Sequence, residues 1–106
     1  MILITEFMND KAVDSLRSKY EVIYDKSLAD NQEKIPDMMK DIKAIIVRNR
    51  TQVNANLLNN SQNLLCVGRL GVGLDNIDLV ACKKRNLTLY PATGANTNGV
   101  VEYVLT

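Results

Sequence analysis

Residues 64–79 read Leu-Leu-Cys-Val-Gly-Arg-Leu-Gly-Val-Gly-Leu-Asp-Asn-Ile-Asp-Leu, and this stretch decides the fold class. It opens with an apolar run, Leu64 to Val67, which is typical of a strand that is buried on both faces. A glycine-rich turn is predicted from Gly68 to Gly73. Asp75 then suits the N-cap of a helix that begins near Asn76. Strand, turn and helix in this order predict one unit of a parallel sheet covered by helices.

The same alternation continues on both sides of this unit. Further short apolar runs predict strands at Ile2–Thr5, Glu21–Asp25, Ile42–Val47 and Leu87–Tyr90, the last of them ended by Pro91. With the central strand these make five. The chain therefore has the pattern of an α/β protein: a flavodoxin-like, five-stranded parallel sheet with helices on both faces, here as an incomplete domain.

Between the strands, apolar residues recur at three- and four-residue spacing, which predicts helices. Asn9 or Asp10 is expected to cap a first helix. A second should start or kink near Ile35, because Pro36 is tolerated only in a first turn. A short third helix is predicted from Asn54 to Asn60. A final one should run from Thr97 to Leu105.

Composition and charge argue against several classes of protein, among them nucleic-acid-binding and membrane proteins. The chain has 106 residues, 46% hydrophobic and 24% charged, which fits one ordinary globular domain at most. The formal net charge of +1 predicts no general attraction to nucleic acid or membrane. Neither a signal peptide nor a run of about 20 apolar residues is visible, so a cytoplasmic protein is expected. Cys66 and Cys82 lie in apolar segments and are predicted to be buried, reduced thiols.

Histidine is absent from the sequence. The commonest general acid-base near neutral pH is therefore missing, and no carboxylate pair or lysine is placed to replace it. No cysteine spacing suggests a metal site. We expect no catalytic residue and no metal ligand set in this chain.

A binding site is still predicted, at the carboxyl edge of the sheet, where ligands of open parallel sheets bind. Gly71 and Gly73 allow successive amides, those of Val72 and Gly73, to converge on an anion such as a carboxylate. The alternative is a tight turn that binds nothing. The order of glycines is not that of the dinucleotide fingerprint.

Arginines follow two neighbouring strands. Arg48, directly after the third strand, can form a fork with an anion, or it is an ordinary surface arginine. Arg50 is expected to be solvated, and Arg69 to fold back against the sheet edge or a carboxylate. Farther along, Asn96 can cap the last helix, donate to a ligand oxygen, or do both.

Three spaced motifs resemble one family. Residues 67–79 and 91–102 are similar to signatures of the D-isomer-specific 2-hydroxyacid dehydrogenases. Residues 47–51 resemble the arginine-bearing loop of the D-3-phosphoglycerate dehydrogenase branch. One departure is Val101, where the family usually has a smaller alanine.

The resemblance implies roles for particular residues. The turn at Gly71, Val72 and Gly73 would hold the substrate carboxylate through backbone amides. The far anionic group of the substrate would bind Arg48, with Asn49 beside it. Asn96 would contact substrate. The roles at the cofactor edge would fall to Val72, Asn96 and Thr97.

The resemblance also implies a division of the chain. Residues 1–90 would be part of the substrate-binding domain, and residues 91–106 a hinge loop and first helix leading toward a dinucleotide-binding domain that is missing here. The parent would use NAD, with NADP left open, and would be a homodimer or larger. Its substrate would be a small anionic 2-hydroxy or 2-keto acid, 3-phosphoglycerate among the candidates. The chain alone is expected to be inactive as a dehydrogenase.

Two other hypotheses stand beside this one. The first is a stand-alone anion-binding or receiver-like regulatory module, which would need an acidic cluster after the first strand and an aspartate after the third. Those places hold residues 5–7 (Thr-Glu-Phe) and Arg48. The second is a role in assembly only, through an apolar face formed by Val100, Val101 and Val104, with self-association or marginal stability as the consequence.

Overall fold

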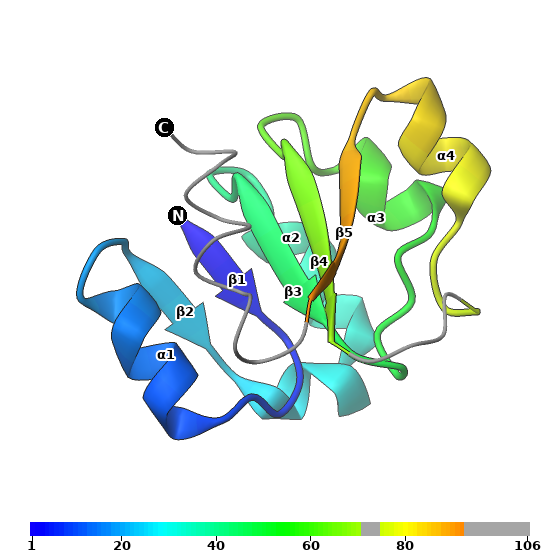
Figure 1. The fold of residues 1–106 in the computed structure, drawn as a ribbon. Coiled ribbons are helices and arrows are strands. Elements are labelled where there is room, and N and C mark those ends of the chain that lie inside the picture. The colour runs from blue at the N-terminus through cyan, green and yellow to red at the C-terminus, as the bar shows by residue number, and fades with distance from the viewer. Residues whose placement is uncertain (71–74, 93–106) are drawn as a thin grey trace.

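The sheet has the strand order that the sequence predicts. The structure is a computed structural model that describes residues 1–70 and 75–92. Five parallel strands lie in the order β2-β1-β3-β4-β5 (Figure 1). The strands are β1 (Ile2–Ile4), β2 (Val22–Tyr24), β3 (Ala44–Val47), β4 (Cys66–Leu70) and β5 (Thr88–Ala92). This order is that of the flavodoxin-like folds, and it reverses direction between β1 and β3.

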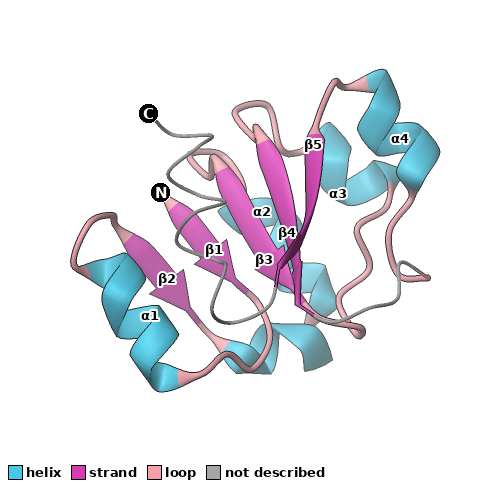
Figure 2. Cartoon of the chain, in the orientation of Figure 1, coloured by secondary structure: helices cyan, strands magenta, loops and turns pink. Residues whose placement is uncertain are grey.

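Side chains of the central strands alternate between two apolar layers. In β1 and β3, Leu3 and Ile45 face one layer, while Ile4 and Ile46 face the other. The first layer is closed by Ile35, Leu57, Leu58 and Cys82 from the helices on that face. The second is closed by Val13 and Leu16 of the first helix. Helices therefore lie on both faces of the sheet, as Figure 2 shows, which is consistent with strands that read as continuous apolar runs.

The first three helices begin where the sequence predicts. Helix α1 (Asp10–Arg17) is capped by the side chain of Asn9, and α3 (Ala55–Asn59) by that of Asn54. Helix α2 (Ile35–Met38) starts at Ile35 and has its proline in the first turn. Two short 3₁₀ turns, Lys26–Asp30 and Gln32–Lys34, precede α2 and were not predicted. No helix in the described part of the chain is long and apolar enough to cross a membrane.

The predicted start of the helix after the glycine-rich turn was wrong, while the helix predicted from Thr97 to Leu105 lies outside the described residues. Helix α4 (Leu79–Lys84) is capped by Asp78, whose carboxylate accepts the N–H of Ala81 at 3.0 Å, and not by Asp75. The cause is a parallel bridge between Val53 and Ile77. Since that bridge holds the chain extended up to Asp78, the helix begins three residues later than near Asn76.

Two strand boundaries also differ from the prediction. Residues 68–70 belong to β4, so the glycine-rich turn does not begin at Gly68. Strand β5 continues through Pro91, which pairs in register with Arg69. A proline is tolerated there because β5 is the edge strand among the described residues, so one of its sides has no neighbouring strand in this part of the chain.

Both cysteines are buried and free, as predicted. Burial raises the pKa of the Cys66 thiol to about 11 from its ordinary 9.0, and it raises the pKa of Cys82 as well. The folded chain therefore keeps protons that the unfolded chain releases at alkaline pH. It follows that the free energy of unfolding falls as the pH rises through this range.

We expect Cys66→Ala to weaken this pH dependence. Raising the pH from 9.0 to about 11 should cost the wild-type chain roughly 2 kcal/mol through Cys66. The variant should lose that component, although its stability at neutral pH will be lower because a small cavity forms. Urea unfolding at several pH values measures both quantities. Equal slopes for the two proteins would contradict the assignment.

Candidate functional site

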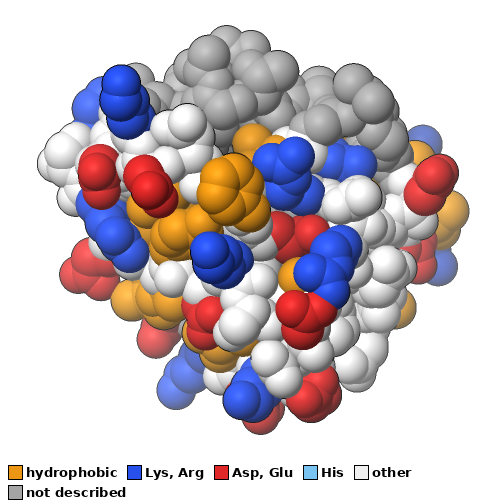
Figure 3. All heavy atoms as spheres, turned by 90° about the horizontal axis from the view of Figure 1, so that it is seen from below, with side chains coloured by type: hydrophobic (Ala, Val, Ile, Leu, Met, Phe, Trp, Pro, Cys, Tyr) orange, Lys and Arg blue, Asp and Glu red, His pale blue; other side chains and the backbone are white. Residues whose placement is uncertain are grey.

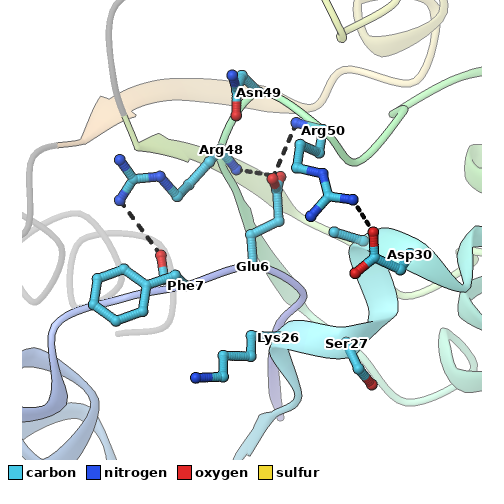
Figure 4. A pocket seen from close by; sticks show the side chains of 9 residues that line it. Glu6, Phe7, Lys26, Ser27, Asp30, Arg48, Asn49 and Arg50 are labelled. Carbon is cyan, nitrogen blue, oxygen red and sulfur yellow. Dashed lines mark hydrogen bonds and ion pairs between the residues drawn. The ribbon is translucent and has the colours of Figure 1, made fainter.

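A cavity of about 440 Å³ opens at the carboxyl ends of β1 and β3, where the strand order reverses. Three segments line it, as Figure 4 shows: residues 6–7 after β1, residues 26–30 in the first 3₁₀ turn, and Arg48–Arg50 after β3. A switch point of this kind is where open parallel sheets bind their ligands. On this side of the molecule, basic side chains lie interspersed with acidic ones, as Figure 3 shows.

Glu6 organises the floor of the cavity. Its side chain is buried, and its carboxylate accepts three backbone N–H groups: those of Arg48 at 2.6 Å, Arg50 at 3.0 Å and Thr51 at 3.0 Å. The hydroxyls of Thr5 and Thr51 lie 2.7 Å apart and add a further bond between the same segments. A buried carboxylate is stabilised by such N–H donors, so it does not need a cationic partner here.

Arg48 points its guanidinium along the opening of the cavity. The side chain is exposed, and within residues 1–70 and 75–92 its guanidinium makes a single hydrogen bond, from Nη1 to the carbonyl of Phe7 at 3.5 Å. That bond is long and therefore weak. Among the described residues, most donors of the fork have no partner. The anion-binding role of Arg48 stays a prediction.

The other two arginines have different surroundings. Arg50 forms an ion pair with Asp30, and both side chains remain more than half exposed, at 57% and 60%. It is solvated, as predicted, and such a pair contributes little stability. Arg69 is buried and folds back to donate to the carbonyl of Leu70 at the end of its own strand, the first of the two predicted possibilities.

Asn76 was not predicted as part of the site. Its side chain is buried, and Nδ2 donates to the carbonyls of Arg48 at 2.9 Å and Thr51 at 2.7 Å. The sequence pattern predicted a helix start near Asn76 and indicated no role for its side chain in the site. Glu6 was also missed, although its place directly after the first apolar run was a usable signal.

The structure describes only part of the predicted site. Arg48 and Asn49 line the cavity. Their roles as substrate contacts stay predictions. Gly71, Val72, Gly73, Asn96 and Thr97 lie outside the described residues. Helix α4 begins at Leu79 and not near Asn76, so the predicted turn is not followed directly by a helix start. Within the described residues, no group of three or more His, Cys, Asp or Glu could hold a metal ion.

Comparison with known proteins gives the family. Residues 2–104 match the model of the catalytic domain of D-isomer specific 2-hydroxyacid dehydrogenases. The chain belongs to this family. It is 47% identical over 105 residues to the (S)-sulfolactate dehydrogenase of Chromohalobacter salexigens and 33% identical over 104 residues to the D-3-phosphoglycerate dehydrogenase of Archaeoglobus fulgidus.

Solved structures share the fold of this chain. A protein from Pyrococcus horikoshii superposes with a TM-score of 0.79 at 22% identity, over 98% of this chain and 31% of its own. The NAD⁺-bound 3-phosphoglycerate dehydrogenase of Entamoeba histolytica gives a TM-score of 0.70 at 25% identity, over 96% of this chain and 35% of its own.

These relatives are longer than this chain. The chain covers 34% of the Chromohalobacter relative and 20% of the Archaeoglobus relative.

Proposed function

We propose that this chain supplies the substrate-binding portion of an NAD-dependent dehydrogenase that acts on a D-2-hydroxy or 2-keto acid carrying a second anionic group. The main support is Arg48 beside the cavity at the β1/β3 switch point, where its guanidinium makes only one long hydrogen bond to the described residues. A planar fork of N–H donors matches a phosphate or sulfonate, each of which offers several acceptor oxygens. The names of two relatives, a sulfolactate and a phosphoglycerate dehydrogenase, point to the same class of acid.

The rest of the proposed site follows the sequence motifs. The carboxylate of the acid would bind the amides of the 71–73 turn, and Asn96 would contact the substrate near the cofactor. Val72 and Thr97 would complete the cofactor edge. Asn49, which lines the cavity next to Arg48, would be a further substrate contact.

We further propose the division that the motifs suggest. Residues 1–90 form the partial substrate-binding domain, and residues 91–106 lead to a dinucleotide-binding domain that supplies the cofactor site and the acid-base chemistry. The cofactor would be NAD, as in the Entamoeba relative, with NADP as the other candidate. The complete enzyme would be a cytoplasmic homodimer or larger assembly. The receiver-like alternative has no support in this geometry, because the residue after β3 is Arg48 and not an aspartate.

A titration tests the proposed binding site. We expect 3-phosphoglycerate and (S)-sulfolactate to bind the chain with dissociation constants of about 1 mM, since only half of the cleft is present. Amide NMR signals of residues 48–51 and 71–73 should shift during the titration. If those signals do not move up to roughly 30 mM of either acid, a range well above weak specific binding, the proposal fails.

A chimera tests the proposed reaction. Residues 1–106 would replace the matching segment of the Chromohalobacter (S)-sulfolactate dehydrogenase, which is 47% identical over 105 residues. We expect the chimera to form NADH from NAD and (S)-sulfolactate, and the chain alone to form none. A folded chimera without activity, or NADH formation by the pure chain, would contradict the proposed division of labour.

A further inference from the structure

Two buried side chains from distant parts of the sequence hold the loop that carries Arg48. The Glu6 carboxylate accepts the N–H groups of Arg48, Arg50 and Thr51. The Asn76 amide donates to the carbonyls of Arg48 and Thr51. We call Glu6 and Asn76 the loop clamp. The clamp binds backbone groups only, so it fixes where the loop lies without occupying the guanidinium.

Asn76 itself has little freedom to move. Its own carbonyl accepts the N–H of Val53 at 2.9 Å, and Val53 in turn accepts the N–H of Asp78 at 2.8 Å. These bonds form the parallel bridge between Val53 and Ile77, both of them buried. The side chain is 5% exposed, so a donor without a partner here would be costly. The clamp is therefore rigid and well satisfied.

The two hydrogens of the amide match the two carbonyls that they meet. Nδ2 reaches the Arg48 carbonyl at 2.9 Å and the Thr51 carbonyl at 2.7 Å, which are the two ends of a four-residue loop. No other side chain of similar size donates two hydrogens from one neutral nitrogen in this way. An aspartate would place an anionic oxygen against two carbonyl oxygens, and an alanine would leave both carbonyls without a donor.

We propose that Asn76, acting with Glu6, is a positioning residue that makes the site favour acids with a second anionic group. The inference rests on the proposed function, in which Arg48 binds that second group. A guanidinium on an exposed side chain loses conformational entropy when it binds, and a fixed loop limits that loss to the side chain. A monoanionic acid does not use Arg48, so its binding does not depend on the clamp.

The experiment compares two acids on matched variants. 3-Phosphoglycerate and D-lactate are titrated against the wild-type chain, Asn76→Asp and Asn76→Ala, with Asn56→Asp as control because Asn56 is exposed on α3. We expect the Asn76 variants to bind 3-phosphoglycerate about tenfold more weakly, the effect of a misplaced charge-assisted hydrogen bond, and D-lactate less than about twofold more weakly. Asn56→Asp should leave both affinities unchanged.

The readout separates positioning from a purely structural role. If Asn76 had a purely structural role, its replacement would lower the melting temperature. In folded samples it would then weaken the binding of both acids equally, or leave both affinities unchanged. An unchanged ratio of the two affinities therefore overturns the inference and leaves the proposed function in place. Failure of the wild-type chain to bind either acid overturns the proposed function, and the inference with it.

A measurement on the wild-type chain tests the inference even if the Asn76 variants do not fold. During titration with 3-phosphoglycerate, the side-chain amide signals of Asn76 should shift together with the backbone amides of Arg48 and Thr51. D-Lactate at equal saturation should shift them much less. Identical shifts with the two acids, or none with 3-phosphoglycerate, would overturn the proposed positioning role.

Discussion

Replacing Arg48 with methionine is expected to weaken the binding of 3-phosphoglycerate by about tenfold to a hundredfold. The reason is the loss of the charge-assisted hydrogen bonding of the guanidinium, which we expect to contribute roughly 1.5–3 kcal/mol in total at this exposed position. Methionine keeps much of the apolar stem, and the Arg48 backbone N–H still donates to Glu6. The loop should therefore remain in place, and the effect should report the guanidinium alone. NMR titration or calorimetry measures the change.

Lys43→Met is the matched control. Lys43 stands immediately before β3 and Arg48 immediately after it, so the two variants remove one positive charge from opposite edges of the sheet. Both side chains are exposed. We expect Lys43→Met to change the affinity less than about twofold, because screening weakens its attraction across the domain. If both variants lose affinity equally, the loss comes from the lower net positive charge of the chain, and the binding site is not at Arg48.

The fold could be predicted because the sequence patterns that specify its strands and most of its helix starts span only a few neighbouring residues. Strands such as Ala44–Val47 are apolar at every position and are separated by capped helical segments, a pattern that few other architectures share. Caps at Asn9 and Asn54 act over three or fewer residues, so their sequence signals suffice. The start of α4 could not be predicted in this way. The helix start depends on a β-bridge between Ile77 and Val53, which lies more than 20 residues away in the sequence. No local sequence pattern predicts that bridge.

The site was predicted only in part for the same physical reason. Arg48 was identified because a cationic residue directly after a buried strand has a local signal. Glu6 and Asn76 act on the loop from sequence separations of 42 and 28 residues, and their hydrogen bonds go to backbone atoms. Every residue type offers the same backbone groups, so the sequence holds no sign of which residues Glu6 and Asn76 bind. Neither could be paired with its target before the fold was known.

Glu6→Ala is expected to lower the free energy of unfolding by about 2–4 kcal/mol. The substitution leaves three N–H groups without their acceptor, those of Arg48, Arg50 and Thr51. Each unsatisfied donor costs roughly 1–3 kcal/mol when buried. Thr51 is fully buried, whereas the first two residues are exposed, so water can replace the carboxylate for them and the total stays below the simple sum.

Glu21→Ala provides the comparison for this prediction. Glu21 is exposed at the opposite, amino edge of the sheet, just before β2, and its loss should change the free energy of unfolding by no more than about 0.5 kcal/mol. Urea unfolding of the three proteins measures both differences. Glu6→Gln should lie between wild type and Glu6→Ala, because a carboxamide keeps one accepting oxygen but turns an N–H₂ group toward the remaining donors. If Glu6→Ala is no less stable than Glu21→Ala, the carboxylate does not hold the Arg48 loop in solution, and the loop clamp loses one of its two members.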